Sequence, residues 1–327
     1  MRERVVWMQG QSLLHRGLSE SVLEAIGDTP LIEVEEGIYA KLEYLNPSGS
    51  IKARIAKYIV EKAEREGLLL PGHTIVEATS GNTGNAFSMV AAIKGYRMVV
   101  LMPEGLSTER VAISRAFGAH IEHVGEFYVT EALKRARELG KKEGYFCPAQ
   151  FDSEWNVEEN REWLGKEILG QLEEGGVGAP DALVMGVGTG GTLIGVGQAF
   201  REKNAEAKLI AVEPEESCTL LCGESGVHKI EGISDGFVPG IYERHAERLG
   251  VDEVYAVGSE EALGAMRWLA RRRGLFVGPS SGANLVAARR LKEAHPELKS
   301  IVTLFCDEGE KYISEHFPAG RRGDATK

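Results

Sequence analysis

Short apolar runs alternate with amphipathic segments along most of the chain. From residue 74 onward, runs rich in Val, Ile and Leu are each followed by a segment with apolar residues at helical spacing. The first pattern predicts buried strands and the second predicts helices packed against them. The expected strands are 74–78, 97–102, 120–124, 145–149, 181–187, 208–212, 253–257 and 300–305. The expected helices are 84–94, 108–117, 130–141, 158–173, 191–202, 260–273 and 281–293.

This alternation predicts an α/β fold, in which mostly parallel twisted sheets are flanked by helices. A chain of 327 residues is long enough for two such sheets. Ligands of parallel sheets bind at the carboxyl ends of the strands. We therefore searched for functional residues in the loops that connect strands to helices.

The turn Asn46–Lys52 precedes this region and leads into a helix. Pro47 and Gly49 interrupt regular structure, and Ser50 suits the N-cap. Lys52 falls in the first helical turn, where the positive helix end and burial would favour the neutral amine that forms a Schiff base. Taken alone, such a lysine is more often a solvated surface charge. The apolar face of the helix consists of Ile51, Ile55, Ile59 and Ala63.

The loop 79–84 joins an expected strand to an expected helix. Its small residues allow a ligand to approach the backbone N–H groups at the helix start. The hydroxyl groups of Thr79, Ser80 and Thr83 add donors that could bind a carboxylate. The same composition is also ordinary for a turn, so this loop alone leaves both interpretations open.

The loop 186–192 fits two kinds of phosphate site. Gly186, Gly188 and Gly191 match the dinucleotide fingerprint, and Glu213 follows at the distance expected of a ribose-binding acid. The same loop could instead surround one phosphate monoester with backbone N–H groups and two threonine hydroxyls. No Gly-Lys-Ser/Thr sequence follows, which excludes a nucleotide-hydrolysing P-loop. The loop by itself leaves an NAD-dependent dehydrogenase as an alternative.

The loop 278–283 carries two serines at a helix start. Ser280 or Ser281 could simply cap the helix. Near a pyridine ring, a serine hydroxyl would leave a mild electron sink suited to β-elimination. A lysine for imine formation, a phosphate loop, an anion-binding loop and a ring-nitrogen partner together indicate a pyridoxal phosphate enzyme. A hydride-transfer enzyme has no use for the lysine turn.

Composition limits the possible binding partners and the cellular location of the protein. The formal charge of −11 and the pI near 5.4 argue against nucleic-acid binding. Four scattered cysteines are too few for a disulfide framework and favour a reducing, cytoplasmic location. Cys218 and Cys222 lack a second ligand pair, so we expect no metal. No segment has the length or apolarity of a signal peptide or membrane span.

Five motifs in this order resemble those of the cysteine synthase branch of the fold type II, tryptophan-synthase-β-like, pyridoxal phosphate enzymes. They are Ile26–Leu31, Asn46–Lys52, Thr79–Gly84, Gly188–Thr192 and Gly278–Ala283. The resemblance covers about residue 20 to 315. It implies a homodimer whose subunits have a smaller mobile domain, 39–153, and a larger domain, 1–38 and 154–327, that holds the cofactor phosphate.

The resemblance also implies residue roles. Lys52 would form the Schiff base and move the Cα proton, Asn82 would bind the cofactor 3′-oxygen, and Ser280 would face the ring nitrogen. The phosphate would be held by Gly188, Thr189, Gly190, Gly191 and Thr192. The substrate carboxylate would be bound by Thr79, Ser80, Thr83 and Gln150.

The activity implied is β-replacement on O-acetyl-L-serine or O-phospho-L-serine by sulfide, giving L-cysteine through an aminoacrylate. Cystathionine β-synthase and serine or threonine dehydratase remain alternatives on the same fold. The chain departs from the family pattern at several positions. Among them, Asp235 stands where a small residue is common, and the segment 306–309 replaces a Pro-Asp/Ser-Ser-Gly sequence. If Asp235 faces the pocket, it would repel a phosphorylated serine unless an arginine compensates.

Overall fold

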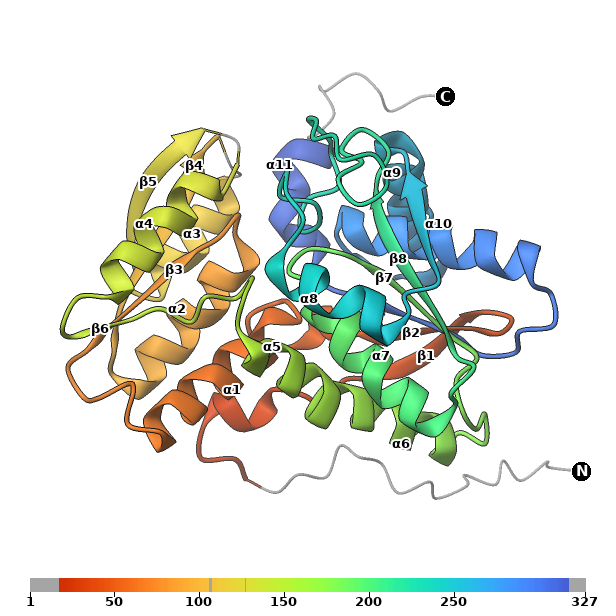
Figure 1. The fold of residues 1–327 in the computed structure, drawn as a ribbon, viewed down its shortest axis with the longest axis horizontal. Coiled ribbons are helices and arrows are strands. Elements are labelled where there is room, and N and C mark those ends of the chain that lie inside the picture. The colour runs from red at the N-terminus through yellow and green to blue at the C-terminus, as the bar shows by residue number, and fades with distance from the viewer. Residues whose placement is uncertain (1–17, 106–107, 127, 318–327) are drawn as a thin grey trace, which may run out of the picture.

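A computed structural model describes residues 18–105, 108–126 and 128–317, which form two sheets (Figure 1). The larger sheet has six strands in the order β1-β2-β10-β7-β8-β9. Only the β1–β2 pair is antiparallel. The strands are β1 (Leu31–Glu35), β2 (Ile38–Leu42), β7 (Ala182–Gly186), β8 (Lys208–Pro214), β9 (Glu253–Val257) and β10 (Ile301–Phe305).

The smaller sheet has four parallel strands in the order β5-β4-β3-β6. These strands are β3 (Thr74–Ala78), β4 (Arg97–Glu104), β5 (His120–Glu126) and β6 (Tyr145–Phe146). The associated helices are α1 (Lys52–Arg65), α2 (Asn82–Lys94), α3 (Thr108–Ala116) and α4 (Thr130–Gly140). This lobe lies to the left in Figure 1, with the larger lobe to its right.

The larger sheet also has helices on both faces. They are α5 (Glu154–Glu159), α6 (Lys166–Glu174), α7 (Gly191–Lys203), α8 (Gly240–Leu249), α9 (Ser259–Trp268) and α10 (Pro279–Ala294). The shorter elements are η1 (Val22–Ala25), η2 (Glu43–Leu45), η3 (Asn160–Gly165), η4 (Leu269–Arg273), η5 (Gly309–Tyr312) and α11 (Ile313–His316). None of the helices among the described residues is long and apolar enough to cross a membrane.

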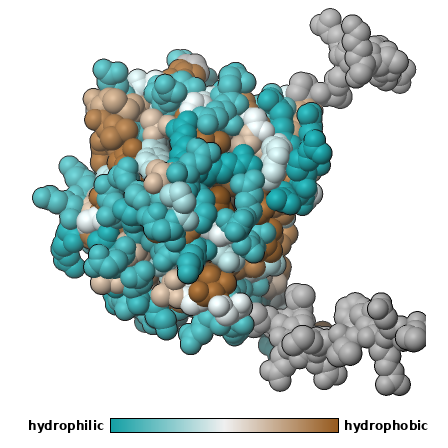
Figure 2. All heavy atoms as spheres, turned by 90° about the vertical axis from the view of Figure 1, so that its right-hand side faces the viewer, coloured by the Kyte–Doolittle hydropathy of each residue, from teal (hydrophilic) through white to brown (hydrophobic). Residues whose placement is uncertain are grey.

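The cores follow from the alternation of side chains along each strand. In β7, Ala182 and Val184 pack with residues of α9 and α10, whereas Leu183 and Met185 pack with residues of α6 and α7. Hydrophobic strand runs are thereby buried on both faces. The outer face in Figure 2, which is the right-hand side of Figure 1, is mainly hydrophilic with separate hydrophobic areas.

The predicted two-sheet α/β fold is confirmed, with three differences in detail. The expected helix 158–173 is interrupted by the π-helical turn η3, and the expected helix 260–273 ends in the π-helical turn η4. Strands β1 and β2 were not predicted. Because β2 pairs with β10 in the larger sheet, the chain leaves that sheet after Leu42 rather than at residue 39.

Candidate active site

One cavity lies between the two lobes, where the carboxyl ends of β3, β7 and β10 meet. The expected site residues that line it come from five distant parts of the sequence. Of the residues expected to form the site, it is lined by Lys52, Thr79, Ser80, Asn82, Thr83, Gln150, Gly188, Thr189, Gly190, Thr192 and Ser280. Gly191 is the remaining one; it is buried as the first residue of α7. The loops selected from the sequence therefore converge on one place.

The turn before Lys52 is held from both sides. Lys52 N donates to the Ser50 hydroxyl over 3.3 Å, although the helix starts after Ile51 and not directly after Ser50. Ile51 N donates to the carbonyl of Cys306 (2.8 Å), next to β10. The buried Lys311 ammonium donates to the carbonyl of Ser48 at 2.9 Å. These contacts fix the start of α1 and with it the position of Lys52.

A buried network of charged side chains also holds the turn before Lys52 in place. The Arg54 guanidinium is fully buried. It pairs with Glu43 at 2.7 Å and with Glu167 at 2.7 Å. Lys41 also pairs with Glu167, at 2.6 Å. Asn46 donates to the Glu43 carboxylate and accepts from the backbone of Gly27. Breaking such a network by removing one partner is costly, because a charge is left buried without its counter-charge.

Glu159 lies close to this network but is not part of its hydrogen bonding. Its side chain is fully buried at the end of α5, and neither carboxyl oxygen has a hydrogen-bond partner among the described residues. Burial raises its pKa to about 8, despite the opposing influence of Arg54. The neutral acid is therefore favoured at neutral pH.

The expected carboxylate-binding loop is pre-organised by its neighbours. Thr83 donates its hydroxyl to the Gln150 side chain at 2.7 Å, and the Gln150 amide donates to the carbonyl of Ala78 at 2.9 Å. Thr79 accepts from the backbone of Gly81 through its hydroxyl (2.9 Å), which leaves the hydroxyl proton available. Glu77, below the loop, accepts from the backbone of Gln150, and burial raises the pKa of Glu77 to about 8.

Asn82 lines the cavity at the start of α2. There it contacts Asp307 and Lys311, which were not predicted as site residues. Its amide nitrogen donates to Asp307 at 2.7 Å, and its amide oxygen accepts from Lys311 at 3.0 Å. Tyr312 also donates to Asp307. An amide nitrogen carries two hydrogens, so one donor of Asn82 remains for a cofactor oxygen.

The loop after β7 fits a phosphate group closely. A Cβ atom at Gly191 would lie 2.2 Å from the Asn156 side-chain oxygen, and one at Gly188 would lie 2.6 Å from the carbonyl of Gly232. Gly190 has a φ of +86°. Since α7 begins at Gly191, its first N–H groups have no partners within the helix and are available to an anion. The residues present thus fit the phosphate of a bound cofactor.

The structure separates the roles of the two adjacent serines. Ser280 lines the cavity, whereas the Ser281 hydroxyl accepts from the backbone of Cys306 at 3.1 Å. Neither side chain caps α10, which begins at Pro279. Cys306 also lines the cavity, and burial raises the pKa of its thiol to about 12, so the thiol is neutral at physiological pH. Ser280 is the hydroxyl available to a ring in the cavity.

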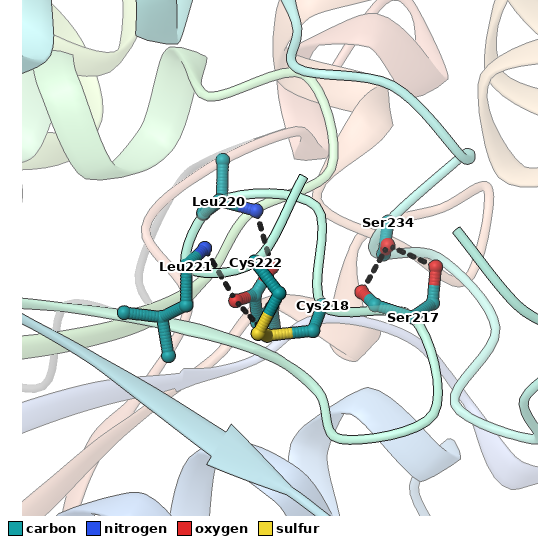
Figure 3. Close-up of a disulfide and its surroundings, with 7 residues drawn as sticks. Ser217, Cys218, Leu220, Leu221, Cys222 and Ser234 are labelled. Atoms are coloured by element: carbon teal, nitrogen blue, oxygen red, sulfur yellow. Dashed lines mark hydrogen bonds between the residues drawn. A yellow bond between two sulfur atoms is a disulfide. The ribbon is translucent and has the colours of Figure 1, made fainter. Parts of the chain in front are cut away.

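The segment after β8 does not support the dinucleotide alternative. The Glu213 carboxylate accepts from the backbone of Leu220 (2.7 Å) and of Leu221 (3.1 Å), so it holds a loop instead of facing a ribose (Figure 3). A disulfide joins Cys218 and Cys222 in the same loop. This pair was not predicted from the sequence, in which the two cysteines were considered only as metal ligands. The loop brings their Cα atoms to 5.3 Å.

Two charged cavity residues were missed or left undecided by the sequence. Arg110 of α3 is buried, and its guanidinium lies 4.7 Å above the Tyr312 ring. Asp235 faces the cavity, which the sequence could not establish, and its burial raises the pKa of its carboxyl group. Arg110 lies in the first turn of α3, directly after the strand–helix loop that follows β4. This position at a strand–helix connection is the signal in the sequence that could have identified it.

Comparison with known proteins shows the family of the chain. Residues 22–307 match the model of a family described as pyridoxal-phosphate dependent enzyme. A cysteine synthase of Staphylococcus aureus is 40% identical over 90% of this chain and 96% of its own. The O-acetylserine dependent cystathionine β-synthase of Helicobacter pylori is 34% identical, with a TM-score of 0.85 over 91% of this chain and 98% of its own. A cysteine synthase of Entamoeba histolytica is 33% identical, with a TM-score of 0.85 over 98% and 96%.

Proposed function

Because the chain belongs to the family of pyridoxal-phosphate dependent enzymes, in its cysteine synthase branch, we propose that it replaces the β-substituent of an L-serine derivative with sulfide. The product is L-cysteine. The observation that carries this proposal is the convergence of Lys52, the carboxylate loop, the phosphate loop and Ser280 on one cavity.

Each part of the cavity has a distinct task. When bound, pyridoxal phosphate supplies a carbonyl carbon that condenses with amines and a ring that withdraws electrons from Cα. Gly188 to Thr192 would hold the phosphate group, and Asn82 and Ser280 would hydrogen-bond the ring substituent and the ring nitrogen. A serine hydroxyl at that nitrogen favours elimination and replacement at Cβ over transamination.

Substrate handling falls to the smaller lobe and to Lys52. Thr79, Ser80, Thr83 and Gln150 bind the α-carboxylate through hydroxyl, amide and backbone donors. The amine of Lys52 removes the Cα proton, and it returns that proton after the sulfur nucleophile has added at Cβ. Release of the first product before the second substrate reacts gives ping-pong kinetics.

The surroundings of the cavity favour O-acetyl-L-serine over O-phospho-L-serine as donor. The adjoining surface presents three carboxyl groups, Asp235, Glu231 and Glu315, against the one guanidinium of Arg110. Burial raises the pKa of Asp235 and raises that of Glu315 to about 7, whereas the pKa of Glu231 is lowered by hydrogen bonds to His316 and Glu315 despite burial. The site therefore offers a doubly negative phosphate one guanidinium beside a carboxylate, and it accepts a neutral acetyl ester. Arg110 alone does not provide the compensation that a phosphorylated serine would require.

Visible absorption and product release test this assignment. The purified protein should be yellow, and Lys52→Ala should lose both the absorption of the covalently held cofactor and the release of acetate from O-acetyl-L-serine. Production of L-cysteine should depend on added sulfide. A colourless protein that binds NAD would contradict the proposal, and so would formation of only ammonia and a keto acid.

The wider organisation is also proposed. We expect a smaller mobile domain that corresponds to 39–153, with its start moved beyond β2, and a larger domain from the rest. A homodimer is expected from the family resemblance. A cytoplasmic location is expected from the small number of cysteines, although two of them pair. Light scattering after size exclusion would measure the first, and fractionation of the source cells the second.

A further inference from the structure

Glu77 is a buried carboxyl group next to the loop that would bind the substrate carboxylate. It is the fourth residue of β3, and the loop 79–84 begins two residues later. Its side chain is fully buried and does not line the cavity, so it cannot touch a bound substrate. Burying a carboxyl group is costly unless its hydrogen bonds compensate. The partners of Glu77 therefore indicate what the residue does.

The side chain of Glu77 joins the end of β3 to the turn at residues 149–150. One carboxyl oxygen accepts from the backbone N–H of Ala78 at 2.9 Å, and the other accepts from that of Gln150 at 3.2 Å. The backbone N–H of Ala149 also donates to this carboxyl group. Successive backbone N–H groups that point to one side form a concave site for an acidic group. Glu77 fills that site from within the chain.

The turn at residues 149–150 requires such support. Ala149 has a φ of +53°. This left-handed conformation is unfavourable for a residue with a side chain, and it persists only where the surroundings hold it. On the other side of the turn, the Ala149 carbonyl accepts from the backbone N–H groups of Asp152 and Ser153, each at 2.9 Å. Glu77 thus completes the set of contacts that fix the backbone at this position.

Gln150 is the residue whose position this turn determines. It lines the cavity, and its side-chain oxygen accepts from the Thr83 hydroxyl at 2.7 Å. Its amide nitrogen donates to the carbonyl of Ala78 at 2.9 Å. An amide nitrogen carries two hydrogens, so one donor remains for a substrate oxygen. Glu77 holds the backbone of Gln150, while Thr83 and Ala78 hold its side chain.

We propose that Glu77 is a positioning residue for the substrate carboxylate and acts through the backbone of Gln150. The inference rests on the proposed function and extends it to a residue that does not touch the substrate. Because Lys52 and the phosphate loop are not among the partners of Glu77, its replacement should weaken binding of the donor amino acid and spare the chemical step. A merely structural role would affect every part of the substrate alike.

The first test is Glu77→Gln in the holoenzyme at saturating pyridoxal phosphate and sulfide. Glutamine has nearly the same shape but supplies only one acceptor oxygen, and its NH2 group opposes a backbone N–H. The KM for O-acetyl-L-serine should rise about 10- to 100-fold with kcat within about 2-fold, the range for one hydrogen bond to a charged group. The visible absorption of the cofactor should keep its wild-type intensity. Glu143→Gln, at an exposed position before β6, is the matched control. An unchanged KM in Glu77→Gln would overturn the proposal.

The second test compares O-acetyl-L-serine with its methyl ester, which has no charged carboxylate. The preference for the acid, measured as the ratio of the two kcat/KM values, should fall about 10-fold in Glu77→Gln. Equal losses for acid and ester would refute the proposal, because Glu77 would then support only the fold. In a Gln150→Ala background, Glu77→Gln should not change the preference further. Effects that multiply would show that Glu77 does not act through Gln150.

Ala149→Pro disturbs the same turn without altering Glu77. Proline fixes φ near about −65° and removes the N–H, so this variant should raise the KM for O-acetyl-L-serine as well. A wild-type KM in Ala149→Pro would contradict the proposal even if Glu77→Gln does not fold. If the wild-type protein releases no acetate from O-acetyl-L-serine, the proposed function itself fails. If the wild type is active and the variants keep its KM and its preference for the acid, only the role of Glu77 fails.

Discussion

Replacing Glu159 with glutamine should raise the unfolding free energy of the protein, by an amount that grows as the pH rises. In the folded chain its buried carboxyl group has a pKa of about 8, against an ordinary value of 4.5. Between these values the folded state holds one proton more than the unfolded state, so stability is lost as the pH rises. At about 1.4 kcal/mol per pH unit, the full loss is roughly 5 kcal/mol, of which about 3 kcal/mol is reached at pH 7.

Glutamine has the shape of the neutral acid and cannot ionise. Glu159→Gln should therefore match the wild type near pH 4 and exceed its unfolding free energy increasingly up to pH 8. Urea titrations of both proteins at saturating pyridoxal phosphate, at pH 5, 6, 7 and 8, measure the difference. Glu174→Gln, at an exposed position on α6, is the control and should leave the pH dependence as it is. A constant difference across this range would show that Glu159 is not the proton-binding group.

Three further predictions concern stability and cofactor binding. Arg54→Ala should lower the unfolding free energy by about 3–5 kcal/mol in urea titrations, because it leaves the buried Glu43 carboxylate without its ion pair and leaves Glu167 with Lys41 alone. Arg135→Ala, at an exposed pair, should cost less than about 1 kcal/mol. Gly191→Ala should weaken pyridoxal phosphate binding in absorbance titrations through its 2.2 Å clash, while Gly170→Ala, which has open space, should not. Cys222→Ser should cost about 2 kcal/mol relative to the oxidised wild type, and a reductant should remove that difference; equal stability in both states would contradict a stabilising disulfide.

The sequence was most informative where local signals and global fold agree. The strands 74–78 and 253–257 were predicted with the bounds that the structure has, because each is a short apolar run between turn residues. The loops after β3 and β7 and the start of α10 were found by the same reasoning. Ligands of parallel sheets bind at the carboxyl ends of the strands, so loops from the two sheets could be combined into one site.

The rest depends on contacts between distant segments. Lys41 and Glu43 resemble solvated charges in the sequence, yet both are buried, because Glu167 and Arg54 supply their partners. Strand β2 belongs to the larger sheet only through β10, which follows it by more than half the chain. Local patterns carry no information about such pairings. The choice between Ser280 and Ser281 likewise required the position of the Cys306 backbone.

The side chain of Asn156 has a consequence for how the cofactor is retained. Its amide donates to the carbonyl of Gln150 at 2.9 Å and to the Thr189 hydroxyl at 3.0 Å, so one side chain spans the substrate loop and the phosphate loop. Any ordering that cofactor imposes on one loop is then shared by the other. Thermodynamic linkage makes such an effect reciprocal. The cofactor and the amino-acid substrate must then strengthen each other's binding by the same factor. A cell well supplied with the amino-acid donor would thus keep more of this enzyme in its loaded form.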